Sequence, residues 1–373
     1  MMVSNTRGIL ILVITSIAIN YNCFAQEGKY SIDLKLRSGF IIPHHDYMAY
    51  FLSENINAIQ LNLGITTDGS NFWNKEYNYP IVGLGLHYSG LGNDTIFGKL
   101  TGLYFFINRL FLHNTKRFNI SNMLSVGLSY ASKSHNLISN RSNMVLSTHL
   151  NVFFQYEIGC NYRVSANHNV SASIGLAHAS NGSVKEPNLG FNIFTTALGY
   201  RYSFGKPNPV KNESPDDNTP SSSWNFGLFA SIKSVDAFTE KQYGIIGLSA
   251  EKLYRFAPLS MVGLEFSAYK DNSIPDLVID KSDDAVTLNK NDNLALAINA
   301  TYLMGFNRIS IVFQPGIYLV NRFYGFGAFS NKVGLRMNVY DEINLVVAIK
   351  AHWLAQADFV EFGIKYSFNK YEK

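Results

Sequence analysis

Large apolar side chains occupy every second position in many short segments of this 373-residue chain. Successive side chains of a β-strand point to opposite faces, so this spacing predicts strands with one apolar face. The opposite face of these segments carries mainly Gly, Ser, Thr, Asn and Lys. The segments with this spacing include Tyr30-Ile32-Leu34-Leu36, Leu84-Leu86-Tyr88, Leu103-Phe105-Ile107, Leu124-Val126-Leu128-Tyr130 and Val262-Leu264-Phe266. The pattern predicts an all-β protein.

The aromatic content favours a transmembrane antiparallel β-barrel over a soluble fold. Aromatic residues make up 14% of the chain and charged residues only 16%. Beyond the N-terminus no stretch reaches the roughly 18 apolar residues that indicate a transmembrane helix. Alternating segments of about ten residues, with Tyr and Phe near their ends, are typical of barrels with aromatic girdles at both membrane interfaces. A soluble β-sandwich, whose apolar face would point into a core, is the alternative.

The charge balance argues against a nucleic-acid partner. The chain has 31 Lys and Arg against 27 Asp and Glu, which gives a formal net charge of +4. These charges are spread along the chain without the basic cluster that binding to phosphates requires.

The N-terminus has the three parts of a secretory signal peptide. Arg7 precedes an apolar run over residues 8–19, and Cys23-Phe24-Ala25 places small residues at the positions that a signal peptidase reads. We therefore expect residues 1–25 to be a signal peptide that is removed after Ala25. Cys160 is then the only cysteine of the mature chain, and we expect it to be a small buried apolar residue.

The chain ends with a pattern that resembles the terminal strand of outer-membrane barrels. Residues 361–368 contain a polar residue, a Gly, and then aromatic residues that alternate up to Phe368. The resemblance implies that the barrel-assembly machinery recognises this strand. A similar run over residues 197–204 would close a first barrel.

Matching segments at nearly one spacing suggest an internal duplication. Gly199 and Gly363 are 164 positions apart, and so are the similar segments 79–84 and 243–248. Gly102 and Gly263 are 161 positions apart. The alternative is that patterns of Gly and aromatic residues recur in the strands of any barrel.

A polar segment divides the chain into two halves. Residues 205–223 hold four prolines, several acidic and Asn residues and three consecutive serines, which is typical of a linker. We expect a first barrel half over residues 26–204, the linker over 205–223 and a second barrel half over 224–373. Two eight-stranded barrels in tandem are favoured, and one barrel of about 16 strands is the alternative.

The segment 168–204 contains the candidate active-site residues. The even positions from Val170 to Leu176 are apolar, and His178 and Ser180 continue that face, so both should project toward lipid. Asn192 likewise shares its parity with outward apolar residues of the next strand. Counted from a periplasmic N-terminus, the strand with His178 ends at the extracellular rim. A His on the same face as a Ser can accept the hydroxyl proton while the oxygen attacks an ester.

The surrounding motif resembles that of a known family. His178-Ala179-Ser180-Asn181-Gly182, followed by Pro187-Asn188-Leu189-Gly190-Phe191-Asn192, is similar to the His-x-Ser-Asn and Pro-Asn-x-Gly-x-Glu motifs of the PagL-type lipid A deacylases and acyloxyacyl hydrolases. The resemblance implies an outer-membrane enzyme that removes an ester-linked acyl chain from lipid A, or lipopolysaccharide. It further implies His178 as the general base, Ser180 as the nucleophile, Asn188 as an oxyanion donor and Asn181 as a neighbour of the pair. The segment 147–151 is also reminiscent of longer members.

One position departs from the family pattern. Asn192 stands where the family has the Glu that orients the His. An amide carbonyl can accept the imidazole N–H, but it stabilises the imidazolium less than a carboxylate does. Lower activity, replacement of the missing carboxylate by Glu186, and loss of activity are the possible consequences.

The second half is expected to be non-catalytic. An alignment that pairs His178 with His352 puts Leu354 at the position of Ser180, and it makes His352 an ordinary interfacial residue. No cofactor is implied, and His44, His45 and Asp46 do not have the spacing of a metal site. The alternative function is a non-catalytic outer-membrane barrel, either a pore or a structural protein, and a surface-binding protein is a weaker one.

Overall fold

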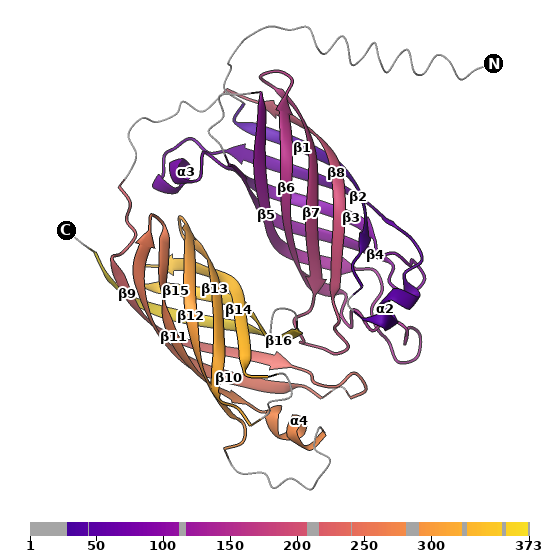
Figure 1. The fold of residues 1–373 in the computed structure, drawn as a ribbon, viewed down its shortest axis with the longest axis vertical. Coiled ribbons are helices and arrows are strands. Elements are labelled where there is room, and N and C mark those ends of the chain that lie inside the picture. The colour runs from indigo at the N-terminus through magenta and orange to yellow at the C-terminus, as the bar shows by residue number, and fades with distance from the viewer. Residues whose placement is uncertain are drawn as a thin grey trace.

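The structure, a computed structural model, consists of two β-barrels in tandem (Figure 1). It describes residues 28–43, 45–111, 117–206, 216–239, 241–280, 291–322, 327–352 and 356–371. Each barrel is closed, antiparallel and eight-stranded. The all-β prediction and the tandem arrangement are confirmed, and the alternative of a single large barrel is wrong. The expected signal peptide and residues 207–215 of the expected linker lie outside the described residues.

The first barrel closes by pairing its first strand with its eighth, with Leu34 opposite Tyr200. Two short helices lie in its connections, α2 (Asp46–Phe51) and α3 (Phe72–Glu76). Its strands are β1 (Tyr30–Ile41), β2 (Ile56–Thr66), β3 (Ile81–Gly90), β4 (Lys99–Leu110), β5 (Phe118–Ala131), β6 (Leu150–Arg163), β7 (His168–Ser180) and β8 (Phe191–Phe204).

The second barrel closes between its first and last strands, with Phe229 opposite Gly363. One short helix, α4 (Ile274–Asp280), follows its third strand. Its strands are β9 (Ser222–Lys233), β10 (Tyr243–Ala257), β11 (Ser260–Asp271), β12 (Leu294–Phe306), β13 (Ile309–Val320), β14 (Phe329–Tyr340), β15 (Ile343–His352) and β16 (Gln356–Lys370).

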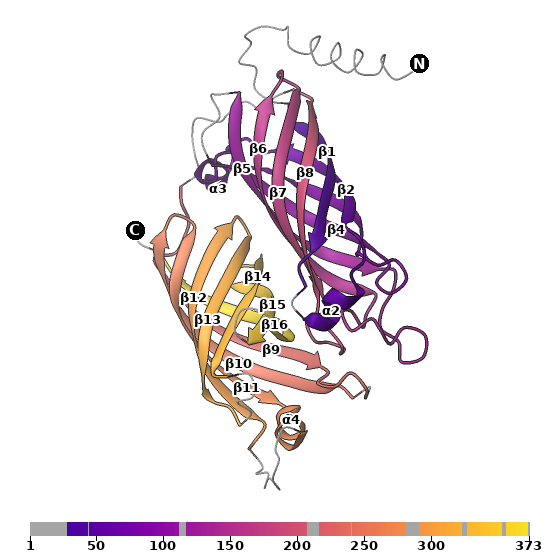
Figure 2. The ribbon, with the colours of Figure 1, turned by 45° about the vertical axis from the view of Figure 1, so that its right-hand side comes forward.

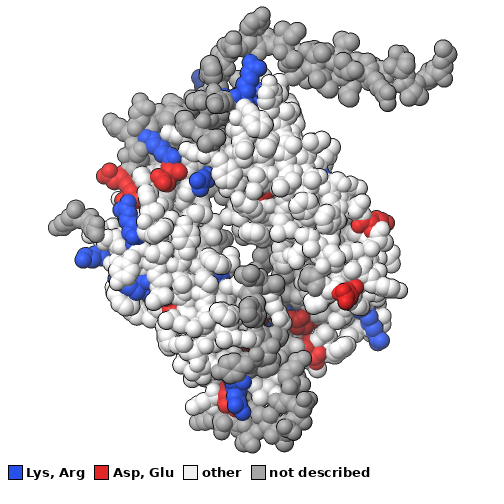
Figure 3. Space-filling model, viewed as in Figure 1, with Lys and Arg blue, Asp and Glu red and all other residues white. Residues whose placement is uncertain are grey.

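The barrels have an apolar outside and a polar inside. On β1, Leu36 is 64% exposed while the adjacent Arg37 is 3% exposed, and the alternation extends along the whole strand. Much of the surface over the strands carries no charged side chain (Figure 3). This polarity is the reverse of a soluble sandwich and is the arrangement of a barrel surrounded by lipid, so the soluble alternative is wrong.

No helix in the described ranges is long and apolar enough to cross a membrane.

Paired polar side chains fill the interior of the first barrel. The carboxylate of Glu157 accepts hydrogen bonds from Lys35 and Arg37, which lie across the barrel on β1. Beside this cluster Tyr104 stacks on Phe153, with ring centroids 5.5 Å apart. An eight-stranded barrel is narrow enough for side chains to fill it, as these do.

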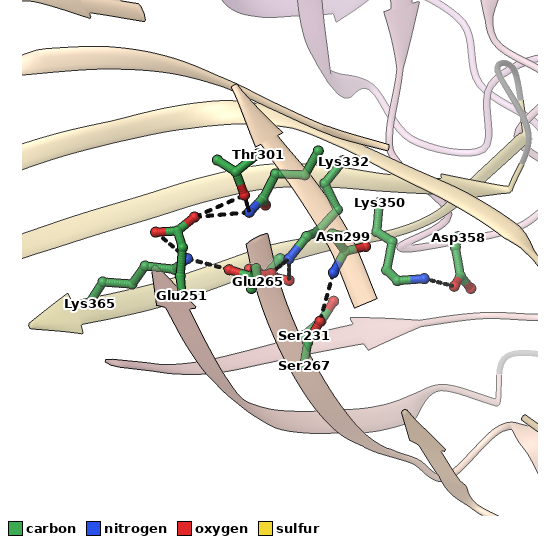
Figure 4. Close-up of polar contacts among 12 residues, drawn as sticks. Ser231, Glu251, Glu265, Ser267, Asn299, Thr301, Lys332, Lys350, Asp358 and Lys365 are labelled. Carbon is green, nitrogen blue, oxygen red and sulfur yellow. Dashed lines mark hydrogen bonds and ion pairs between the residues drawn. The ribbon is translucent and has the colours of Figure 1, made fainter. Parts of the chain in front are cut away.

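The second barrel has a larger ionic network (Figure 4). Glu265 forms ion pairs with Lys332 and Lys365, and Glu251 pairs with Arg336 at 2.7 Å. Because these charges are buried, each depends on its partners in place of water.

The connections at the two ends of the second barrel differ in length. At one end, the turns 258–259, 307–308 and 341–342 join consecutive strands, while the other end carries α4 and longer segments. Short turns are typical of the periplasmic end of such barrels. In both views α2 and α4 lie at the same lower end of their barrels (Figures 1 and 2), so the two barrels run in the same direction.

The segments that suggested a duplication lie on strands that are not equivalent. Residues 79–84 lead into the third strand of the first barrel, whereas residues 243–248 begin the second strand of the second barrel. Consecutive strands alternate in direction, so these two run oppositely. Gly102 and Gly263 likewise lie on a fourth and a third strand. Only the match between β8 and β16 relates equivalent strands, and the recurrence of Gly and aromatic residues in barrel strands explains the others.

Two expectations about single residues were wrong. Cys160 is exposed on the outer face of β6, because it has the same parity as the outward-facing Tyr156 and Ile158. His352 is not interfacial: it is 6% exposed in the interior of the second barrel, with Nε2 3.2 Å from a carboxylate oxygen of Asp358. The even positions of β15 face inward, whereas those of β7 face outward, so the alignment of His178 with His352 joins opposite faces.

Candidate active site

Sheet geometry brings His178, Ser180 and Asn192 together on the outer face of the first barrel. Ser180 follows His178 by two positions on β7, so the two side chains project from the same face. Asn192 on β8 is the residue directly opposite His178 in the strand register. Opposite residues in an antiparallel pair have their Cβ atoms about 5 Å apart, which is close enough for their side chains to hydrogen-bond. The three residues predicted from the sequence therefore meet in space.

The three side chains form a continuous hydrogen-bonded chain. Oδ1 of Asn192 lies 2.7 Å from Nδ1 of His178, and Nε2 of His178 lies 2.9 Å from Oγ of Ser180. Since an amide oxygen can only accept, Nδ1 of His178 donates and carries the imidazole proton. Nε2 is then unprotonated and accepts the hydrogen bond from the Ser180 hydroxyl. This is the tautomer that a general base requires.

The loop 181–190 between β7 and β8 brings Asn188 to the same place. Oδ1 of Asn188 accepts a hydrogen bond from the backbone N–H of Asn181 at 3.0 Å. This contact turns the Nδ2 amide group away from Asn181. Nδ2 is buried and has no hydrogen-bond partner among the described residues. A buried donor without a partner is costly in a folded protein, and such groups are candidates for binding a ligand or a reaction intermediate.

Gly190 allows the loop to return close to the His178–Ser180 pair. Its φ is +73°, a conformation that side chains with a Cβ rarely adopt. A Cβ at this position would lie 3.0 Å from Cε1 of His178 and 3.2 Å from Cβ of Ser180. The loop therefore contacts the pair with backbone alone.

Glu186 is engaged within its own loop. Its carboxylate accepts a hydrogen bond from the backbone N–H of Asn188 at 2.8 Å. Burial raises the pKa of Glu186 above its ordinary value, and hydrogen bonds to the carboxylate offset this only in part. Asn192 is the residue at Nδ1 of His178, while Glu186 supports the backbone that carries Asn188.

A second loop, between β5 and β6, supports the first. The Ser147 hydroxyl donates to the backbone carbonyl of Lys185, and Nδ2 of Asn181 donates to the Ser147 oxygen at 2.9 Å. The backbone N–H of Gly190 donates to the carbonyl of Val145 at 3.0 Å. Sequence reasoning did not assign Ser147 to the site, although the family-like segment 147–151 contains it. Asn181 thus has a supporting role that connects both loops.

The corresponding region of the second barrel has different chemistry. Asp358 lies near three cationic or titratable side chains in the interior, with Lys233 at 2.6 Å, His352 at 3.2 Å and Lys350 at 3.8 Å. The position aligned with Ser180, Leu354, lies outside the described residues. Asp358 and these three side chains lie in the barrel interior, whereas the candidate site of the first barrel faces outward.

The fold is that of an outer-membrane β-barrel, and two family models identify the class of protein as a hydrolase of esters. The model described as lipid A 3-O-deacylase (PagL) matches residues 57–201, and the model described as acyloxyacyl hydrolase, C-terminal domain, matches residues 222–370. The chain belongs to the PagL family of lipid A deacylases and acyloxyacyl hydrolases, with one model for each barrel.

Two solved structures match part of the chain. The outer-membrane enzyme PagL is 18% identical, covers 46% of this chain and 99% of its own, and has a TM-score of 0.32. Neisserial surface protein A is 11% identical, covers 48% of this chain and 98% of its own, and also has a TM-score of 0.32. No curated protein sequence matches the chain significantly.

Proposed function

We propose that this protein hydrolyses an ester-linked acyl chain of lipid A at the outer-leaflet rim of the first barrel. In this proposal Ser180 is the nucleophile, His178 the general base, Asn192 the residue that orients His178, and Asn188 the oxyanion donor. The observation that carries it is the hydrogen-bonded chain from Asn192 through His178 to Ser180. Family membership supports lipid A as the substrate.

The proposed reaction has two halves. Nε2 of His178 takes the proton of Ser180 as Oγ attacks the ester carbonyl, and the tetrahedral intermediate then expels the sugar alkoxide, which takes that proton from His178. Water, deprotonated by His178, attacks the resulting acyl-serine and releases the fatty acid. Ser180 then regains its proton from His178. No cofactor is needed for this sequence.

The free amide group of Asn188 supports its role as the oxyanion donor. A preorganised donor stabilises the negative oxygen of the tetrahedral intermediate because it is already oriented and needs no rearrangement. Asn188 is held by the N–H of Asn181, so its Nδ2 is oriented before a substrate binds.

Connection lengths and outward orientation support a location at the outer leaflet. The site lies at the end of the first barrel opposite α3, which is also the end that carries α2. In the second barrel the corresponding end has the long connections that are typical of the extracellular side. His178 projects from the face whose other residues, such as Ile174 and Leu176, are exposed to the surroundings of the barrel.

The filled interiors argue against a pore as the main function. Glu157 with Lys35 and Arg37 spans the first barrel, and Glu265 with Lys332 and Lys365 spans the second. Conduction would require these buried ion pairs to open.

The test is mass spectrometry of lipid A from outer membranes that contain the protein or its Ser180→Ala variant. The proposal predicts the loss of one acyl-chain mass with the wild type and unchanged lipid A with the variant. Unchanged lipid A in both samples, with folded protein present in each, would overturn it.

A further inference from the structure

The loop that carries Asn188 is attached to the second barrel by three hydrogen bonds. The Ser183 hydroxyl donates to the carbonyl of Ala357 at 2.9 Å, and the N–H of Ser234 donates to the carbonyl of Ser183 at 2.9 Å. Nε2 of Gln242 donates to the carbonyl of Val184 at 3.1 Å. Ala357 lies at the start of β16, while Ser234 and Gln242 are the first and last residues of the loop between β9 and β10. The loop 181–190 therefore belongs structurally to both barrels.

Close packing accompanies these hydrogen bonds. Val360 has the parity of the outward-facing Phe362 and Ile364 on β16, yet Val360 is 5% exposed while those two are 56% and 54% exposed. A Cβ on Gly182 would lie 2.3 Å from Cγ2 of Val360. The loop thus covers Val360, and the glycine permits backbone contact with its side chain.

A second contact fixes the barrels to each other at their opposite ends. Tyr77 follows α3, and its hydroxyl donates a hydrogen bond to the carbonyl of Gly305 at 3.1 Å. The ring of Tyr77 also packs on the ring of Phe306, with centroids 4.7 Å apart. Trp73 makes an edge-to-face contact with the same Phe306 ring. With contacts at both ends, the orientation of the second barrel relative to the first is constrained, so its rim gives the loop a defined support.

Residues 182–184 are directly linked to the groups that hold Asn188. Asn181 precedes them and donates its N–H to Asn188, while its Nδ2 donates to the carbonyl of Lys185 at 2.8 Å. Any shift of residues 182–184 is therefore transmitted to both ends of this hydrogen-bonded turn. Displacement of a catalytic group by about 1 Å can reduce a rate by roughly 100-fold.

We propose that the second barrel is a positioning element of the active site, which holds the loop 181–190 through Val360, Ser234 and Gln242 so that Asn188 stays aligned with Ser180. This inference rests on the proposed function. It assigns the second barrel a part in turnover that acts through the loop and not through contact with the reacting atoms. The partner surface is the second barrel of the same chain.

The test compares Val360→Trp with Ile364→Trp in the full-length protein. Both changes place a Trp side chain on the outer face of β16, but only position 360 lies under the loop. Hydrolysis of purified lipopolysaccharide in detergent gives kcat and apparent KM, and the gel mobility of unheated samples measures the folded fraction. We expect kcat of Val360→Trp to fall by about tenfold or more per folded molecule, with KM changed by less than about twofold, because the loop affects the intermediate more than substrate binding. Ile364→Trp should behave like the wild type.

Retention of wild-type kcat by folded Val360→Trp would overturn the inference. An equal loss in Ile364→Trp would also overturn it, because the effect would then be independent of the loop. If Val360→Trp does not fold, the double variant Val360→Ala, Gln242→Ala decides by the same criteria, since it removes packing and one hydrogen bond without adding volume. Failure of the proposed function is distinguishable, because the wild type itself would then release no fatty acid.

Discussion

Asn192 lies directly across the β7–β8 pair from His178, with its amide oxygen 2.7 Å from Nδ1 of the imidazole. This contact orients the ring and selects the tautomer whose Nε2 accepts from Ser180. An amide has no charge, however, so it would stabilise the imidazolium of the proposed reaction less than a carboxylate would. Asn in place of the family's Glu therefore preserves the hydrogen bond to His178 but weakens the electrostatic stabilisation of its charged form.

Replacement of Asn192 by Glu should increase activity. A carboxylate at this position keeps the hydrogen bond to Nδ1 and adds attraction to the imidazolium, so we expect kcat to rise by about tenfold or more. Asn192→Leu, which removes the acceptor, should lower kcat by a similar factor. The measurement is the rate of fatty-acid release from lipopolysaccharide. Equal rates for the wild type and both variants would show that Asn192 does not act on His178.

Loss of the Asn188 amide should affect the chemical step. Asn188→Ala removes the free Nδ2 group, and removal of one oxyanion donor costs about 100- to 1,000-fold in kcat. Lys185→Ala is the matched control, because Lys185 is an exposed residue of the same loop that contributes its backbone carbonyl to the contacts described. Steady-state kinetics of both variants provide the check. A change in KM alone for Asn188→Ala would contradict the role of an oxyanion donor.

Gly190→Ala should impair the site without unfolding the barrel. The added Cβ would meet the His178 ring and Ser180, and φ of +73° is unfavourable for alanine by about 1–2 kcal/mol. We expect a folded protein that reacts slowly with a fluorophosphonate, which labels an activated serine. Gly244→Ala on β10 is the control, because a Cβ there has no atom within 4 Å. Labelling of Gly190→Ala at the wild-type rate would show that the close approach is not needed.

Glu186 should make the stability of the loop depend on pH. Burial raises its pKa in the folded protein, so the folded state binds the proton more tightly than the unfolded state does. The corresponding stability is complete below the ordinary pKa of 4.5 and is lost as pH rises through the raised folded value. Glu186→Gln keeps an acceptor for the Asn188 N–H and has no titrating group. We expect this variant to gain thermal stability over the wild type as pH rises above 4.5, measured by the temperature at which gel mobility changes. A difference that is constant with pH would refute this linkage.

Removal of Glu265 should destabilise the second barrel. Its carboxylate lies between Lys332 and Lys365 in the interior, and a buried charge without its partner costs about 3–5 kcal/mol. Glu265→Ala should therefore unfold at a lower denaturant concentration in detergent. Lys241→Met is the comparison, because it breaks an exposed ion pair with Asp276 and should have little effect. Equal midpoints for the two variants would show that the interior network does not stabilise the barrel.

The face on which a residue of a strand lies could be determined from the sequence. Side-chain parity is a local property of extended backbone, so the alternation of apolar and polar residues identified the barrel strands and the outward projection of His178, Ser180 and Asn192. The same rule places Cys160 outward, with Tyr156 and Ile158, and the expectation that it is buried did not use that rule.

Contacts between distant segments depended on tertiary structure. The loop 181–190 is longer than a tight turn, and only tight turns impose a register on their strands, so the pairing of His178 with Asn192 could not be derived from the loop. The orientation of the Asn188 amide depends on Asn181. The cover of Val360 depends on a barrel that folds from a separate part of the chain.

The sequence by itself determined a membrane barrel with a Ser and a His on its outer face, because strand periodicity and motif spacing are encoded in neighbouring residues. Only the tertiary structure decided that Asn192 reaches His178 and that Nδ2 of Asn188 has no partner among the described residues. It also decided that the second barrel contacts the loop 181–190. These relationships arise from strand register and from packing between residues far apart in the chain, and local sequence patterns do not specify either one.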